Sequence, residues 1–266
     1  WHLSKYNPIR VSKQANSVSK ITSRLGLRFM DKDINNNEYA NPDLLVDTSW
    51  LNDHLYEKDL RIVDCDVSEQ YQRAHIPGAV TQKDHYQKGT PPNHINIMGP
   101  EEFSEMARSL GIENSTLVIA YDNSRGLYAA RLWWALNYYG HTNVKVLNGG
   151  WKKWTSEGRP ITTDSTIHTT SSKFEPCENQ SLMTTTDQLL NIKDLRGVII
   201  WDVRSKEEYT GENDRGNKFK GHIPGATHLE WLNLVDETTH LLKPAKELLS
   251  LLGDHGITKD KRIHSY

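Results

Sequence analysis

A five-residue motif that occurs twice constrains the fold of this chain more than any other feature of its sequence. The segments His75–Ala79 and His222–Ala226 both read HIPGA, and they lie 147 positions apart. A second pair of landmarks, the Gly-Ile turns that begin at Gly111 and Gly256, recurs 145 positions apart. Landmarks that recur in one order and at nearly one spacing indicate a tandem duplication, so we expect two copies of one folding unit.

Predicted strands alternate with predicted helices in the first copy. The apolar segments 61–64 and 116–121 have the length of buried strands, and the segments 101–110 and 126–140 have the length and pattern of helices. Strands that alternate with helices imply a parallel sheet covered by helices on both faces. The predicted fold class is therefore α/β, with two tandem units of which the second is incomplete.

The composition divides the chain into four predicted parts. Residues 1–40 form a leader, because residues 1–30 carry six basic side chains and no acidic one; it is either transit-like or disordered. Residues 41–160 form the first unit, and residues 161–186, rich in Thr and Ser, form a linker. Residues 187–266 form the second unit, which lacks a counterpart of residues 122–158.

Charge, hydropathy and cysteine count exclude several classes of protein. The net charge of -2 gives no general reason to expect nucleic acid as a partner, and no apolar run approaches the ~18 residues that span a bilayer. Two cysteines, Cys65 and Cys177, argue against a disulfide framework and a Cys-rich zinc site. We therefore expect neither a metal nor a cofactor. We expect a monomer or weak dimer in a reducing compartment, either the cytoplasm or the mitochondrial matrix.

Three motifs stand in an order that resembles a known family. They are the paired HIPGA segments, GLYAARLWW at residues 126–134 and LNGGWKKW at residues 147–154. Together they resemble the tandem rhodanese-like sulfurtransferases, which act on thiosulfate or 3-mercaptopyruvate. The resemblance implies transfer of a sulfane sulfur through a cysteine persulfide, from a small anionic donor to cyanide or a thiol.

The resemblance places the nucleophilic cysteine in the loop that follows a central strand, where backbone N–H groups favour the thiolate. In the first unit Asp122 occupies that position. A carboxylate forms no persulfide and repels an anionic donor. The first unit is therefore expected to carry a pseudo-active site, composed of Asp122 and Arg131.

The second unit is expected to carry the functional loop. The two copies align Tyr121 with Tyr266, so the cysteine is expected directly after Tyr266, and this chain alone is expected to be an inactive fragment. Cys65 follows a predicted core strand and Cys177 lies in the predicted linker. Neither is expected to act as the nucleophile: Cys65 is expected to be buried, and buried free cysteines usually serve packing, while Cys177 is expected to be exposed with no helix N-terminus beside it.

Two arginines are candidates for binding the anionic donor, because guanidinium groups bind such anions in bidentate fashion. They are Arg204 and Arg215, and the alternative is that both form surface ion pairs with neighbouring carboxylates. Glu208 stands where the resemblance implies another arginine, which leaves the choice of donor open. The residues expected to support the site are Asp202, His222 and Tyr266.

Two alternatives remain open at this stage. The protein could be a non-catalytic rhodanese-fold binding module, in which no cysteine follows Tyr266. A phosphatase on the same fold would need a longer Cys-x5-Arg loop, and the arrangement of an inactive unit before an active one disfavours it.

Overall fold

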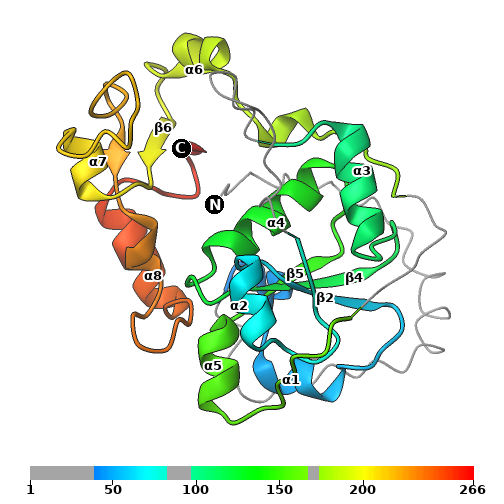
Figure 1. Ribbon diagram of the computed structural model, residues 1–266. Helices are drawn as coiled ribbons and strands as arrows, with labels where there is room; N and C mark the ends of the chain where they lie inside the picture. The colour runs from blue at the N-terminus through cyan, green and yellow to red at the C-terminus, as the bar shows by residue number, and fades with distance from the viewer. Residues whose placement is uncertain (1–38, 83–96, 167–173) are drawn as a thin grey trace, which may run out of the picture.

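Two parallel sheets follow one another along the chain (Figure 1). The computed structural model describes residues 39–82, 97–166 and 174–266. The first sheet has five strands in the order β1-β5-β4-β2-β3, and the second has three in the order β7-β6-β8. All paired strands are parallel, which confirms the predicted α/β class. The basic segment 1–38 lies outside the described residues, so its role stays a prediction.

The strands and helices lie where the hydrophobic patterns place them. The strands are β1 Leu45–Val46, β2 Leu60–Asp64, β3 Val80–Thr81, β4 Leu117–Tyr121, β5 Val144–Leu147, β6 Val198–Asp202, β7 Thr227–His228 and β8 Arg262–Ser265. The α-helices are α1 Thr48–Asp53, α2 Ser68–Arg73, α3 Pro100–Ser109, α4 Leu127–Tyr138, α5 Gly150–Ser156, α6 Thr186–Ile192, α7 Lys206–Thr210 and α8 Ala245–Asp254. Short 3-10 turns are η2 Pro42–Leu44, η3 Gln180–Leu182 and η4 Trp231–Leu234.

Helix α3 illustrates how local sequence sets these boundaries. Pro100 occupies the first turn, where its missing N–H costs no hydrogen bond, and Glu101 beside it complements the positive end of the helix dipole. Arg108 lies in the last turn, where a cation complements the negative end. Phe103 and Ala107, four residues apart, form a buried stripe against the sheet.

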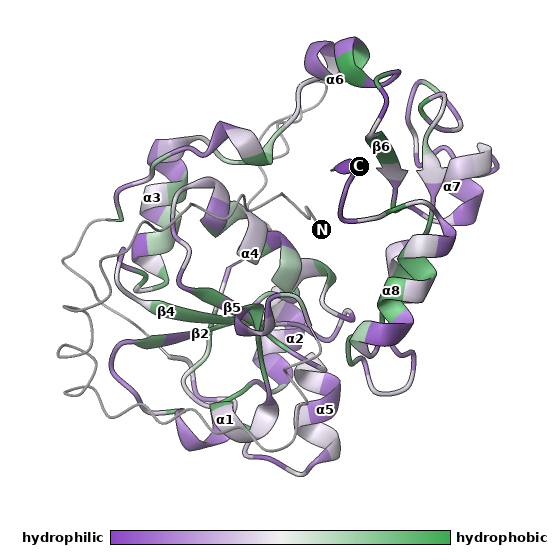
Figure 2. Cartoon of the chain, turned by 180° about the vertical axis from the view of Figure 1, so that it is seen from behind, coloured by the Kyte–Doolittle hydropathy of each residue, from purple (hydrophilic) through white to green (hydrophobic). Residues whose placement is uncertain are grey.

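The core of the first unit has two layers, one on each face of the sheet. Side chains of successive strand residues point to opposite faces, so Val118 and Ala120 of β4 pack toward α3 and α4, whereas Ile119 and Tyr121 pack toward α1 and α5. Trp154 of α5 is fully buried in the second layer. The central strands β4 and β5 are accordingly the most hydrophobic part of the unit (Figure 2). Burial of each large apolar side chain contributes about 1.5–3 kcal/mol.

The second sheet repeats one half of the first. Its order β7-β6-β8 corresponds to β3-β2-β4, since β7 and β3 both follow an HIPGA turn. Its core consists of Trp201, Leu229, Leu234, Ile257 and Ile263, and the apolar face of α8 packs against it. In this sheet β8 is an edge strand, whereas its counterpart β4 is central.

Part of the predicted linker is bound to the first unit. Phe174 is buried in the first core, at 1% exposure. The backbone N–H groups of Cys177 and Asn179 donate to the carbonyl oxygens of Tyr139 and Tyr138 at the end of α4. Such contacts join distant positions and have no local sequence signal.

Candidate active site

The two HIPGA turns share one arrangement of Tyr and His. Nδ1 of His75 lies 2.8 Å from the carbonyl oxygen of Tyr71, and Nδ1 of His222 lies 2.8 Å from that of Tyr209. The ring centroids of each pair are 3.7 Å apart and the rings are stacked. His75 is fully buried, whereas His222, which was expected to support the site, is exposed.

Two tyrosines at the strand ends occupy equivalent places. The hydroxyl of Tyr121 donates to Oδ2 of Asp64 at 2.7 Å and accepts from the backbone N–H of Ile76 at 3.1 Å. The hydroxyl of Tyr266 accepts from the backbone N–H of Ile223 at 2.9 Å. Ile76 and Ile223 are the second residues of the two HIPGA motifs. The contacts therefore support the alignment of Tyr121 with Tyr266.

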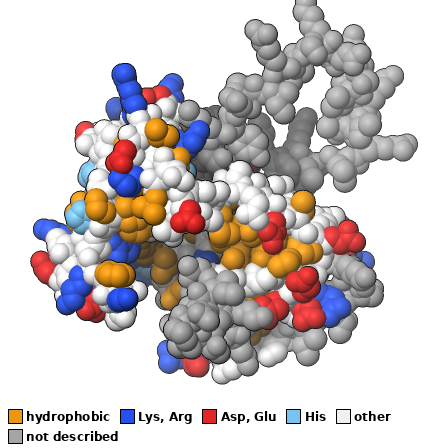
Figure 3. Space-filling view, turned by 90° about the horizontal axis from the view of Figure 1, so that it is seen from above, with side chains coloured by type: hydrophobic (Ala, Val, Ile, Leu, Met, Phe, Trp, Pro, Cys, Tyr) orange, Lys and Arg blue, Asp and Glu red, His pale blue; other side chains and the backbone are white. Residues whose placement is uncertain are grey.

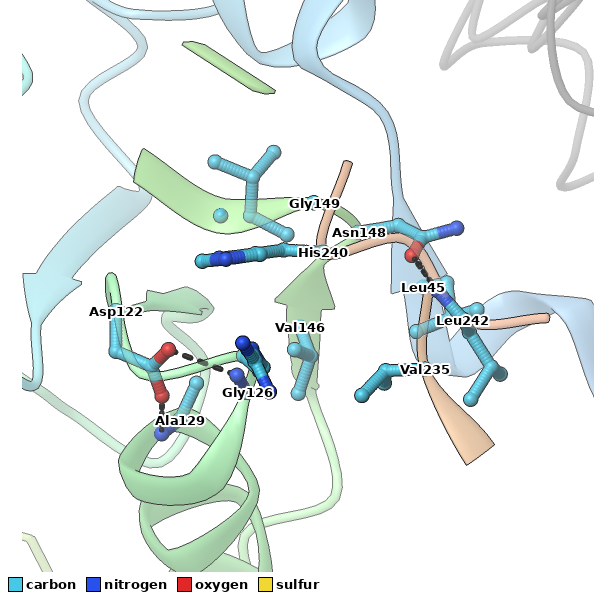
Figure 4. A pocket seen from close by; sticks show the side chains of 13 residues that line it. Leu45, Asp122, Gly126, Ala129, Val146, Asn148, Gly149, Val235, His240 and Leu242 are labelled. Carbon is cyan, nitrogen blue, oxygen red and sulfur yellow. Dashed lines mark hydrogen bonds between the residues drawn. The ribbon is translucent and has the colours of Figure 1, made fainter. Parts of the chain in front are cut away.

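A cradle of four backbone N–H groups surrounds the carboxylate of Asp122 (Figure 4). Oδ1 accepts from Ser124 and Gly126, each at 2.8 Å, and Oδ2 accepts from Tyr128 at 2.9 Å and Ala129 at 2.8 Å. These donors belong to the loop after β4 and to the first turn of α4, whose N–H groups have no intrahelical partner. The positive end of the helix dipole adds to them, so the cradle is built to hold an anion.

The first unit fills and surrounds this cradle with negative charge. Asp66 accepts from the backbone N–H of Asn123 at 2.6 Å, so a second carboxylate holds the same loop. Burial raises the pKa of Asp64 to about 7, and the charges of Asp66 and Asp122 add to the rise. Burial also raises the pKa of Asp122, while its four N–H donors oppose that rise. This environment repels an anionic ligand.

The glycine pair of LNGGWKKW fixes the backbone of Asp122. Gly150 has a φ of +50°, and a Cβ there would lie 2.2 Å from the carbonyl oxygen of Asp122. The backbone N–H of Trp151 donates to the same oxygen at 2.9 Å. The absence of a side chain at Gly150 therefore permits the close approach of this turn to the backbone of Asp122.

The second unit places a cation where the first has Asp66. The guanidinium of Arg204 binds Asp202 through two nitrogens, with Nε 3.0 Å from Oδ1 and Nη2 2.6 Å from Oδ2. Nη2 also donates to the carbonyl oxygen of Gly221 at 2.9 Å, and Cζ lies 5.1 Å from the ring centroid of Tyr266. Burial would raise the pKa of Asp202, but the hydrogen bonds from Arg204 hold that pKa below its usual value.

The remaining candidates lie apart from these groups. Arg215 has a φ of +50° in an exposed loop, and its guanidinium pairs with Glu208 at 3.4 Å, which is the predicted alternative to a ligand contact. Arg131 is half-buried in α4. In the described part of the chain Arg125, rather than Arg131, lines the cavity beside Asp122. Roles for Arg131 and Arg215 in a site stay predictions.

Side chains from the second unit also line this cavity, and no local sequence pattern predicts that contact. Val235, His240 and Leu242 line it together with residues of the first unit (Figure 4). The backbone N–H of Leu242 donates to Oδ1 of Asn148 at 2.8 Å. Burial and the nearby charge of Arg125 lower the pKa of His240. Asp66, by contrast, could have been noticed as a second acid two residues after the end of β2.

Comparison with known proteins identifies the family. The rhodanese-like domain matches residues 47–157 and 185–266. The chain belongs to the rhodanese-like sulfurtransferase family. It is 35% identical over 241 residues to the sulfur carrier protein TtuD of Thermus thermophilus, covering 86% of this chain and 83% of that protein.

Two further relatives support this assignment. The thiosulfate sulfurtransferase of Cricetulus griseus is 30% identical over 229 residues, covering 79% of this chain and 76% of that protein. The crystal structure of SseA from Escherichia coli, described as a 3-mercaptopyruvate sulfotransferase, superposes with a TM-score of 0.75 at 26% identity. That match covers 84% of this rhodanese-like chain and 87% of SseA.

Neither a helix suited to span a membrane nor a cluster of metal-ligating side chains occurs among the described residues. No helix in this part of the chain is long and apolar enough to cross a membrane. No group of three His, Cys, Asp or Glu side chains there is arranged to hold a metal ion.

Proposed function

We propose that this rhodanese-like protein moves a sulfane sulfur from thiosulfate or 3-mercaptopyruvate to cyanide or a thiol through a cysteine persulfide. The cysteine occupies the position in the second unit that is equivalent to Asp122, directly after Tyr266. The observation that carries the proposal is the cradle of four N–H groups around Asp122, because the family's persulfide anion needs such donors.

The reaction has two displacements. The cysteine thiolate attacks the sulfane sulfur of thiosulfate, the S–S bond of the donor breaks, and sulfite leaves with the electron pair. The acceptor thiolate or cyanide then attacks the outer sulfur of the persulfide, and the electron pair of that S–S bond returns to the cysteine. Each step forms one bond to the transferred sulfur and breaks one, so no external oxidant or reductant is required.

The distribution of charge supports the proposal that this chemistry belongs to the second unit. Arg204 stands beside Tyr266 with its guanidinium held in place by the fully buried Asp202. A fixed cation near the nucleophile favours the thiolate and offsets the negative charge of the donor. Arg215, whose guanidinium pairs with Glu208 at 3.4 Å, is the second cation proposed for the donor. In the first unit the equivalent place holds Asp66, and the carboxylate of Asp122 already fills the cradle.

Sulfur uptake by the protein extended through the residues after Tyr266 tests the proposal. Incubation with thiosulfate or 3-mercaptopyruvate should add one sulfur atom to the peptide that follows Tyr266, as detected by mass spectrometry, and cyanide should release it as thiocyanate. Replacing the cysteine in that peptide by Ser should abolish both results. The control variants Cys65→Ser and Cys177→Ser should retain both.

If the protein takes up sulfur from neither thiosulfate nor 3-mercaptopyruvate, the proposal is wrong. That result would favour the alternative, a non-catalytic binding module on the rhodanese fold. If uptake occurs, the ratio of kcat/KM for the two donors identifies the preferred one.

A further inference from the structure

The second unit carries an insertion that the first unit lacks. Tyr71 and His75 of the first unit are separated by 4 positions, whereas their counterparts Tyr209 and His222 are separated by 13. Both pairs keep the same stacked geometry, so the extra residues form a loop that does not disturb the Tyr–His contact. We name residues 212–220 the insertion loop.

The insertion loop is a folded structure with a narrow neck. Gly211 and Gly221 form the neck, and a Cβ on Gly211 would lie only 3.0 Å from the backbone nitrogen of Gly221. Asp214 organises the loop, because its carboxylate accepts from the backbone N–H of Gly216 at 2.9 Å and its carbonyl oxygen accepts from Asn217 at 2.7 Å. A loop that closes on itself in this way presents its tip in a fixed shape.

The tip exposes an aromatic ring between two lysines, Lys218 and Lys220, in a loop that also carries the acidic residues Glu212 and Asp214. Phe219 is 79% exposed, and Nζ of Lys218 lies 5.3 Å from its ring centroid. The side chains of Lys220 and Arg215 are each 66% exposed and bind their carboxylate partners at 3.4 Å. Lys218 forms no ion pair within the described ranges 39–82, 97–166 and 174–266. In the space-filling view, Lys and Arg side chains are interspersed with Asp and Glu side chains around the edge of the molecule (Figure 3).

The neck of the loop is attached to the proposed site. The carbonyl oxygen of Gly221 accepts from Arg204, whose guanidinium binds Asp202 and lies over the ring of Tyr266. The neck of the loop is therefore anchored to the groups beside Tyr266, after which the sulfur-carrying cysteine is proposed to lie. The first unit, whose cradle is filled by Asp122, has no such loop.

We propose that the insertion loop is the docking surface for a protein that carries the sulfur-accepting thiol on an acidic face. This inference rests on the proposed function, because it names the acceptor for the same site. An exposed aromatic ring is the residue type that anchors protein interfaces, and lysines around it select carboxylates and speed association. Cyanide is too small to need such a surface.

Direct binding tests the docking surface without any catalysis. The probe is a fluorescein-labelled peptide in which Leu and Ser stand between Glu and Asp residues, with Ser in place of the acceptor cysteine. Two control peptides carry Lys at the acidic positions or Ser at the Leu position. Fluorescence anisotropy with the 266-residue chain should show binding of the acidic Leu peptide that weakens as salt rises.

Variants at the tip should weaken this binding. Phe219→Ala and Lys218→Glu should each raise the Kd about fivefold or more, since loss of an anchor or reversal of a rim charge costs about that factor. The matched control Leu249→Ala removes another exposed side chain, 71% exposed on α8, and should leave the Kd within about twofold. Equal binding of acidic and basic peptides, or no effect of Phe219→Ala, would overturn the docking proposal.

Sulfur transfer by the extended protein distinguishes failure of the docking proposal from failure of the proposed sulfurtransferase activity. With the cysteine form of the acidic peptide as acceptor, Phe219→Ala should raise KM about fivefold and leave kcat unchanged, while transfer to cyanide stays at the unaltered rate. Equal loss with both acceptors would overturn docking. No transfer to cyanide by the unaltered protein would overturn the proposed function, and the binding measurements would still decide the docking surface.

Discussion

Replacing Asp122 by Ala should destabilise the first unit by about 3 kcal/mol. The substitution removes the acceptor of four backbone N–H groups, and each buried donor left without a partner costs about 1–3 kcal/mol. The N–H of Ala129 is buried and bears the full cost, whereas water can reach those of Ser124 and Gly126 in the half-exposed loop. Relief of the buried charge of Asp122 offsets part of the loss.

Thermal unfolding followed by circular dichroism measures this loss. For a unit of this size a loss of about 3 kcal/mol corresponds to a fall in Tm of about 10–15 °C. The matched control is Asp53→Ala, which removes an exposed carboxylate at the end of α1. A Tm for Asp122→Ala within about 2 °C of this control would refute the reasoning, because it would mean that the cradle is satisfied without the carboxylate.

Three further substitutions probe the same frame. Gly150→Ala places a Cβ 2.2 Å from the carbonyl oxygen of Asp122, so urea unfolding should show a loss of more than about 3 kcal/mol. Arg204→Met leaves Asp202 buried without its cation; because the folded pKa of Asp202 is depressed, the loss of about 3 kcal/mol should be present at pH 8 and shrink as the pH falls below about 4. Asp64 has a folded pKa of about 7, above its unfolded value. Its contribution to the free energy of unfolding is therefore fully present below about pH 4 and is lost as the pH rises through 7. Urea midpoints at pH 5 and pH 8 should therefore differ less in Asp64→Asn than in the unaltered protein, and equal differences would contradict the assignment.

Local pattern was sufficient to predict most of the frame. The HIPGA repeat, the apolar runs and the helix boundaries depend on residues close together in sequence, so the strands β2 and β4 and the helices α3 and α4 lie where they were expected. The equivalence of Tyr121 and Tyr266 also followed from spacing, and their contacts to Ile76 and Ile223 agree with it.

The site itself could be predicted only in part. The expectation that Asp122 stands in the place of a nucleophile came from its position after β4, and it stays a prediction. The pairing of Arg204 with Asp202 instead of a surface acid depended on side-chain direction, which spacing does not specify. The packing of residues 174–179 against the first unit could not be predicted, because a Thr- and Ser-rich composition indicates a linker whether or not the segment is packed.

The sequence by itself determined the duplication, the α/β class and the absence of a persulfide-forming residue at Asp122, because each is written in local pattern and spacing. Tertiary structure alone decided which groups meet. Asp66 reaches the loop of Asn123 across 57 positions, and Leu242 reaches Asn148 across 94, from the other unit. Such contacts form only when the strands align in register and the two units pack against each other. Strand alignment and packing therefore decide which charged side chains surround Asp122 in the first unit and Tyr266 in the second.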